Sequence, residues 1–473
     1  MRSGRGLSLA GNSPTIIGRS ASARGGNDSP GGKMGVFSAL RFRNYRLFWL
    51  GQLVSVTGTF MQGTAQQWLV LTLSHNNPMP LGIVGALQFG PMLVPFGGAI
   101  ADRWPRRRVL MGTQAAAGVL ALVLWVLTLL NVAQLWQVYV LALLLGIVNA
   151  VDMPTRQAFV SEMVPQDYLL NAISLNSAQF NASRIVGPGL AGLMIALFGM
   201  PLLFLLNAIS YIAVIGGLAM MRPADLVPLP ERAIQHGMAR IRALGDGARF
   251  VLSQRTVLIT FLIIAVVGTM GFNFNVLLPV EATNVLHAGS AIFGLLTSAL
   301  GAGALIGALL LAKRGGKPTN RMLVSTAGAF GLLEMAIAFS HSVPLTLLLI
   351  AFTGFTTSMF SASANTRVQL ASPIELRWRV MAVYTMVFIG TTPIGSLIVS
   401  SVAAAGGVPL GFIVSGLPCF VVALVAAWLW RGSLGIAPAR VAAPVIVRPN
   451  PVDTPPLALP TNPEPAAVAK GRA

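Results

Sequence analysis

Residues 101–131 read ADRWPRRRVLMGTQAAAGVLALVLWVLTLLN. A short turn with four arginines is followed by an apolar run that continues to residue 130. A bilayer hydrocarbon core of about 30 Å is crossed by about 20 consecutive apolar residues in a helix. The stretch therefore predicts a transmembrane helix over 109–131, entered from a basic turn.

The rest of the chain extends this pattern. Hydrophobic residues make up 55% of the 473 residues and charged residues only 10%, with a mean hydropathy of +0.74, whereas soluble domains carry about 25% charged residues. The composition predicts an all-α polytopic membrane protein. The apolar stretches place about twelve crossings near 47–73, 81–101, 109–131, 135–153, 176–198, 201–221, 256–280, 292–312, 321–340, 343–362, 380–403 and 408–430.

The basic residues indicate how these crossings are oriented. With twelve crossings, 31 of the 32 Lys and Arg residues fall on one side of the membrane, and the remaining one, Arg184, lies inside a crossing. Cytoplasmic loops collect Lys and Arg, so we expect a multi-pass protein of the bacterial inner (cytoplasmic) membrane with both termini cytoplasmic. The net charge of +19 then reflects topology and attraction to anionic lipid, and we expect no nucleic-acid partner.

The chain repeats itself. Arg103 and Arg314 follow the second and eighth crossings, Arg156 and Arg367 follow the fourth and tenth, and both pairs are 211 residues apart. Two parallel six-helix repeats can rock around one central site. The predicted organisation is a disordered cytoplasmic arm (1–36), an N-terminal six-helix bundle (37–221), a cytoplasmic linker (222–255), a C-terminal six-helix bundle (256–431) and a disordered cytoplasmic tail (432–473).

A family resemblance supports this organisation from about Phe37 to Arg431. The stretch GAIADRWPRR at 98–107 resembles the loop signature of the major facilitator superfamily between its second and third helices. Further stretches resemble the branch with the enterobactin exporter and other transmembrane secretion effectors: Asn44-Tyr45-Arg46 with Gly51-Gln52, PTRQAF at 154–159, and GPGLAG at 187–192. Two features depart from the pattern, because Pro105 replaces the usual Gly and the second copy, at 312–314, lacks the acidic residue.

Because the sequence contains no nucleotide-binding motif, we expect transport to draw on the proton gradient, by antiport with alternating access between the two repeats. The resemblance implies a secondary transporter with the major-facilitator fold that exports drug-like or siderophore-like molecules. It assigns a conformational latch to Gly98, Asp102, Arg103, Arg106 and Arg107. Alternatively, Asp102 only balances the arginines on a solvated turn. It also assigns an antiporter bend in the fifth helix to Gly187, Pro188 and Gly192, where the alternative is a generic proline kink with glycine packing.

Polar residues within the crossings predict a transport cavity. Five hydrogen-bonding side chains in the first crossing are spaced three and four residues apart and share about a quarter of the helix surface, which lipid cannot satisfy. The predicted lining set is Gln52, Ser55, Thr59, Gln62, Gln66, Asn149, Arg184, Asn273 and Asn275, with Thr353, Thr356 and Thr357 as further candidates. The alternative is that individual members join helices to one another.

Charged residues in the bilayer are costly and therefore informative. Arg184 is a candidate partner for an anionic substrate, or it extends to the membrane surface. Asp152 and Glu281 are the candidates for proton coupling, although Arg156, one turn from Asp152, could hold it in a structural pair. Glu334 has no assigned role.

Other function classes fit less well. The four histidines are scattered, and we find no metal-spaced cluster, phosphate-binding loop or nucleophile elbow, so we expect no enzyme activity, cofactor or metal. The expected partners are a small-molecule substrate, protons and the lipid bilayer, with the chain acting as a monomer. An uptake permease or facilitated carrier is the alternative, and a non-transporting scaffold would not need the polar first crossing.

Overall fold

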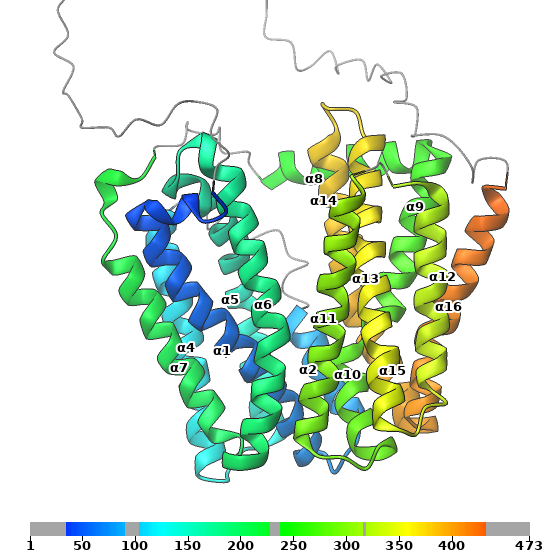
Figure 1. The fold of residues 1–473 in the computed structure, drawn as a ribbon, viewed down its shortest axis with the longest axis horizontal. Coiled ribbons are helices and arrows are strands. Elements are labelled where there is room, and N and C mark those ends of the chain that lie inside the picture. Colours follow the sequence, from blue (N-terminus) through cyan, green and yellow to red (C-terminus); the bar gives the residue numbers. More distant parts are fainter. Residues whose placement is uncertain (1–34, 90–103, 228–236, 316–317, 432–473) are drawn as a thin grey trace, which may run out of the picture.

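The protein is described by a computed structural model over residues 35–89, 104–227, 237–315 and 318–431 (Figure 1). Within these ranges the chain forms helices and no strand. This agrees with the predicted all-α class.

In its described residues the first half contains a short entry helix and six longer ones. They are η1 (Ser38–Arg41), α1 (Arg43–Leu73), α2 (Met79–Phe89), α4 (Arg106–Leu129), α5 (Leu135–Met163), α6 (Gln166–Phe198) and α7 (Pro201–Ala219). The connection to the second half contains η3 (Pro223–Asp225) and α8 (Gly237–Ser253). Helix α8 thus lies within the linker predicted at 222–255, and it is amphipathic in sequence.

The second half repeats the arrangement with two interrupted crossings. It consists of α9 (Arg255–Val266), η4 (Val267–Gly271), α10 (Phe274–Val280), η5 (Glu281–Val285), α11 (Ser290–Arg314), α12 (Asn320–Ile337), α13 (Val343–Ala371), α14 (Arg377–Gly390), α15 (Thr392–Gly406) and α16 (Val408–Leu429). The wide turns η4 and η5 are π-helical and lie on either side of α10, a feature common at functional sites.

Where the structure describes them, the predicted crossings correspond to helical segments, with different ends. In the described residues nine spans are long and apolar enough to cross a membrane, and α1, α2 and α12 complete the set of twelve. The fourth, fifth and tenth crossings are longer than predicted, because α5 continues to Met163, α6 begins at Gln166 and α13 continues to Ala371. Polar residues continue these helices beyond the apolar stretch that hydropathy detects. Residues 90–103, the remainder of the second crossing and the turn after it, lie outside the described part.

The helices form two bundles side by side, α1–α7 and α9–α16 (Figure 1). The described chain begins and ends at the same end of the molecule, which we call the terminal end; the opposite end, with the turns at Ser74 and Gly199, is the far end. Helix α8 lies at the terminal end and packs on α14, where Arg379 donates to Asp246 at 2.5 Å.

Small residues allow close packing inside each bundle. A Cβ atom on Gly303 of α11 would lie 1.8 Å from the carbonyl oxygen of Ala351, and one on Gly354 of α13 would lie 2.0 Å from that of Leu300. Such approaches favour association in lipid, where apolar burial does not drive helices together.

The two halves meet toward the far end. Helix α6 packs along α11 and α2 along α15. Ser290 donates to the carbonyl of Gly192 at 3.1 Å, Ser298 to that of Ile185 at 2.6 Å and Ser396 to that of Gly82 at 3.2 Å. Among the described residues, the hydrogen bonds that join the halves lie in the far half of the bundle. The molecule is therefore closed at its far end.

Candidate functional site: a polar cavity in the first bundle

A cavity of about 790 Å³ is lined by residues of the first bundle. Its volume falls in the range of small-molecule binding sites. Helices α1, α2, α4, α5, α6 and α7 all contribute to it. Its polar lining residues are Gln52, Thr59, Gln62, Gln66, Gln88, Gln114, Asn149, Asp152, Arg156, Gln157, Asn176, Ser177, Gln179, Asn181 and Tyr211.

Most of the polar stripe predicted in the first crossing lies at this cavity. Gln52, Thr59, Gln62 and Gln66 line it. Ser55 is buried and is not among the lining residues, while its carbonyl accepts a hydrogen bond from Thr59 at 2.9 Å. The polar residues of α1 thus line the cavity, and Thr59 also makes a hydrogen bond within the helix.

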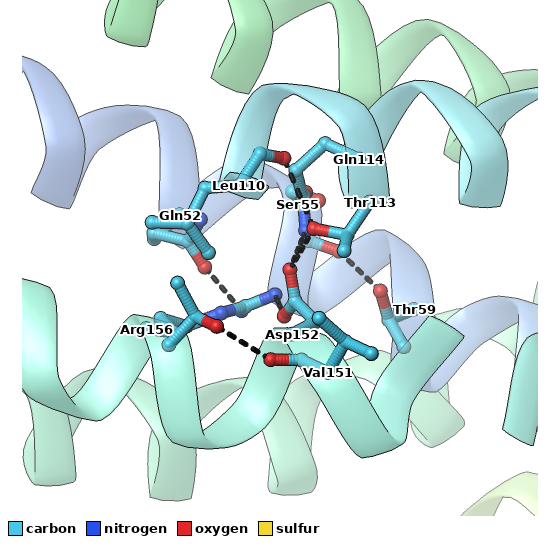
Figure 2. A network of polar contacts seen from close by, with 10 residues as sticks. Gln52, Ser55, Thr59, Leu110, Thr113, Gln114, Val151, Asp152 and Arg156 are labelled. Atoms are coloured by element: carbon cyan, nitrogen blue, oxygen red, sulfur yellow. Dashed lines mark hydrogen bonds and ion pairs between the residues drawn. The ribbon is translucent and has the colours of Figure 1, made fainter. Parts of the chain in front are cut away.

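Asp152 lies at the centre of a hydrogen-bond network (Figure 2). Its side chain on α5 is 2% exposed. On α4, Thr113 donates to Oδ1 of Asp152 at 2.7 Å and Gln114 donates to the same oxygen at 2.8 Å. Arg156, one turn further along α5, forms an ion pair with Oδ2. Figure 2 shows Thr113, Gln114 and Arg156 turned toward the carboxylate.

The network also joins α5 to α1. Nη1 of Arg156 donates to Oε1 of Gln52, so the guanidinium connects the carboxylate of one helix with the carboxamide of another. A charged side chain inside the membrane is stable only with such partners. A change in the Asp152 charge would therefore reach α1, α4 and α5 together.

A second network fastens α1 to α7. Asn207 donates to Oε1 of Gln62 at 2.7 Å and accepts from Ser210 at 3.0 Å. Gly58 makes room for this contact, because a Cβ atom there would lie 2.6 Å from Oδ1 of Asn207. Gln62 is thus both a wall residue and a link between helices.

Other predicted site residues lie elsewhere. Arg184 is not among the lining residues, and its Nη2 donates to Asn181 at 3.3 Å. Asn273 is 2% exposed and donates to carbonyls of its own helix, while Asn275 accepts from Gln67 at 3.3 Å, where α10 meets α1. Glu281 is 1% exposed, within η5 of the second bundle.

The predicted latch is only partly within the described residues. Gly98, Asp102 and Arg103 lie outside them. Arg106 forms an ion pair with Glu162 at 2.6 Å, and Arg107 donates to the carbonyls of Leu218 at 2.7 Å and Ala219 at 2.9 Å. These arginines tie the start of α4 to the terminal ends of α5 and α7.

The predicted bend occupies two different interfaces. A Cβ atom on Gly187 would lie 2.7 Å from Cβ of Phe60 on α1, within the first bundle. One on Gly192 would lie 2.4 Å from the carbonyl of Ser290 on α11, in the second bundle. Pro188 lies between them, inside α6.

Several residues that line or support the cavity were not predicted from the sequence. Thr113 and Gln114 are polar residues inside the apolar run 109–131, which is a detectable signal, as are Gln88 and Gln179 in their own crossings. Tyr211 gave no distinguishing signal, because a tyrosine in an apolar stretch is also typical of core packing. In the described residues no cluster of three or more His, Cys, Asp or Glu side chains is placed to hold a metal ion.

Comparison with known proteins identifies relatives along most of the chain. The family described as transmembrane secretion effector matches residues 34–436. A staphyloferrin A transporter of Staphylococcus aureus is 28% identical, over 80% of this chain and 94% of that protein. The multidrug efflux pump Tap of Mycolicibacterium fortuitum is 30% identical (77% and 90%), and the enterobactin exporter EntS of Shigella flexneri is 24% identical (76% and 85%).

Solved structures of transporters share the fold. The POT family transporter PepTSo superposes with a TM-score of 0.65 at 13% identity, covering 83% of this chain and 98% of its own. A mutant of the nucleoside transporter NupG gives 0.61 at 14% identity, covering 83% and 99%. At this identity the likeness concerns the fold alone.

Proposed function

The chain belongs to the transmembrane secretion effector family of membrane transporters, and we propose that it moves small molecules out of the cytoplasm by alternating access. Inward movement of protons drives this export. Similarity to a multidrug efflux pump and to siderophore transporters supports the assignment. The observation that carries it is a polar cavity in a molecule whose halves are joined toward the far end.

The terminal end faces the cytoplasm in this proposal, since the basic residues concentrate there. The cavity then receives substrate from the cytoplasm while the α6–α11 and α2–α15 contacts keep the far end closed. Release requires that these contacts break and that the terminal ends of the bundles approach one another. Two bundles rocking about a central site give this exchange.

Asp152 is the proposed site of coupling. A proton on its carboxylate removes the charge that holds Arg156 and weakens the links to α1 and α4. Proton and substrate then bias the same two-state equilibrium, which is the condition for coupling. Glu281 is the second proposed proton site, because it is buried near the far end where opening would admit water.

The substrate can be sought directly in cells. Metabolites in the medium of a deletion strain are compared with those of the parent strain, with and without iron. A compound missing from the deletion strain's medium, and restored by the plasmid-borne gene, is the substrate for the following assay. An unchanged medium under both conditions, together with unchanged drug sensitivity, would contradict export.

The coupling is tested in everted vesicles, where export appears as uptake into the vesicle. An imposed pH gradient should drive accumulation, and a protonophore should abolish it. Asp152→Asn, alone and with Glu281→Gln, should remove the accumulation above equilibrium. If the variants still accumulate substrate in a protonophore-sensitive manner, these carboxylates are not the coupling sites. If accumulation by the unmodified protein ignores the protonophore, a facilitated carrier is the better account.

A further inference from the structure

The net charge of the cavity wall indicates which chemical class of substrate it can bind, which membership of the family does not. Among the described lining residues only Asp152 and Arg156 carry a formal charge, and they form an ion pair with each other. Gln52, Thr113 and Gln114 hold the pair in place. The described wall is therefore neutral as a whole.

The same wall presents many unused hydrogen-bonding groups. Gln66, Gln88, Asn149, Gln157 and Gln179 line the cavity, and their side chains make no hydrogen bond within the described residues. Each primary carboxamide has both donors and an acceptor. The five residues come from α1, α2, α5 and α6, so the groups surround the space rather than form one patch.

An apolar surface accompanies the carboxamides. Phe60 and Phe180 line the cavity and meet edge to face, with ring centroids 5.3 Å apart. Exposed ring surface of this kind binds aromatic or flat apolar groups. The cavity thus combines polar, uncharged side chains with an aromatic corner.

From these observations we infer that the substrate is an uncharged molecule rich in amide, hydroxyl or phenol groups with an aromatic or apolar part. A charged group entering the cavity leaves water and needs a counter-charge in return. Arg156 and Asp152 form an ion pair with each other, so neither offers an unpaired charge to an ion. An uncharged molecule with paired donors and acceptors meets five free carboxamides instead.

This inference rests on the proposed function only for the identity of the cavity as the substrate site. It concerns the state in which Asp152 is ionised and paired, when substrate is loaded. Arg184, the predicted partner for an anion, is not a wall residue, and its Nη2 donates to the side chain of Asn181.

The test uses three probes with one skeleton and the full-length protein in lipid nanodiscs. Chloramphenicol is neutral and carries an amide, two hydroxyls and an aromatic ring; its succinate ester is an anion, and its deacylated amine is a cation at mildly acidic pH. Equilibrium dialysis without any gradient measures the Kd of each. We expect the neutral probe to bind at least about tenfold more tightly than either ion, a difference of about 1.4 kcal/mol.

Two variants should shift the selectivity toward probes of opposite charge. Gln179→Glu should raise the affinity for the amine severalfold, and Gln179→Lys should raise that for the succinate ester, because each adds one unpaired charge to the wall. Gln369→Glu, on an exposed position of α13 outside the cavity, should change none of the three affinities.

Three outcomes would overturn the inference. They are tighter binding of either ion by the unmodified protein, no binding of any probe up to its solubility, and equal effects of the Gln179 and Gln369 variants. The outcome is independent of energy coupling. Neutral selectivity together with gradient-independent vesicle transport would keep the inference and contradict proton antiport.

Discussion

At the scale of single residues, the ion pair between Asp152 and Arg156 is the most constrained feature of the site. The carboxylate accepts hydrogen bonds from α4 and forms an ion pair within its own helix, and the guanidinium continues to Gln52 on α1. Removing one partner of such a pair leaves the charge of the other without a counter-charge, which destabilises the protein.

Asp152→Asn should therefore insert normally and lower transport severalfold. The amide keeps an oxygen for Thr113 and Gln114, so the local fold persists, whereas Arg156 loses its charge partner. The initial rate of substrate uptake into everted vesicles, normalised to protein content, measures the effect. Asp225→Asn, at an exposed carboxylate of η3, is the matched control. An unchanged rate in a correctly inserted Asp152→Asn protein would reduce Asp152 to a structural role.

At the scale of helices, the crossing of α6 and α11 determines whether the far end can close. A Cβ atom on Gly192 would lie 2.4 Å from the Ser290 carbonyl and 2.9 Å from Cα of Gly294. Both nearest groups are backbone atoms, so no side-chain rotation relieves the clash. The helices would have to separate.

Gly192→Val should accordingly favour the state that is open at the far end. In a Cys419→Ser background, Ser400→Cys reports that opening, because Ser400 is buried in the α2–α15 interface. A membrane-impermeant maleimide should label the new thiol faster by about tenfold or more, as expected for a shift above about 1.4 kcal/mol. Gly216→Val is the control, since nothing lies within 4 Å of a Cβ there. Equal labelling in both variants would show that α6 and α11 do not control closure.

The same reasoning applies to the terminal ends of the first bundle. Arg107 donates to two carbonyls at the end of α7, where a positive charge also matches the helix dipole. Arg107→Ala should lower the free energy of unfolding by about 1.5–3 kcal/mol, as for hydrogen bonds to a charged group. The melting temperature of the purified protein measures this, and Arg108→Ala, at a neighbouring exposed arginine, should leave it unchanged. A lower value for Arg108→Ala alone would contradict the assignment.

At the scale of the whole molecule, the two bundles and their shared terminal end imply one topology. Both chain ends and the α8 region should face the cytoplasm, because the basic residues concentrate on that side. Green fluorescent protein fused at Arg440 or Ala239 should fluoresce, and alkaline phosphatase fused at the same positions should be inactive. Active phosphatase at either position would reverse the orientation and, with it, the proposed direction of transport.

The class of protein, the number of crossings and the repeat could be predicted from the sequence. Each depends on local quantities: the cost of moving a residue into lipid, the position of Lys and Arg, and the distance between Arg156 and Arg367 along the chain. These quantities need no knowledge of which helices touch. The stripe from Gln52 to Gln66 was likewise found from helical spacing, and four of its five members line the cavity.

The composition of the site depended on the tertiary structure. Gln114 and Asp152 are 38 residues apart and meet only because α4 packs on α5, while Arg184, a charge inside a crossing, is not among the residues that line the cavity. Periodicity determines which side chains share a face of one helix, but the rotation and crossing of packed helices determine which faces enclose a common space. Hydropathy and charge therefore specified a twelve-crossing membrane protein, and helix packing decided that its described cavity wall is neutral, rich in carboxamides and built from the first bundle.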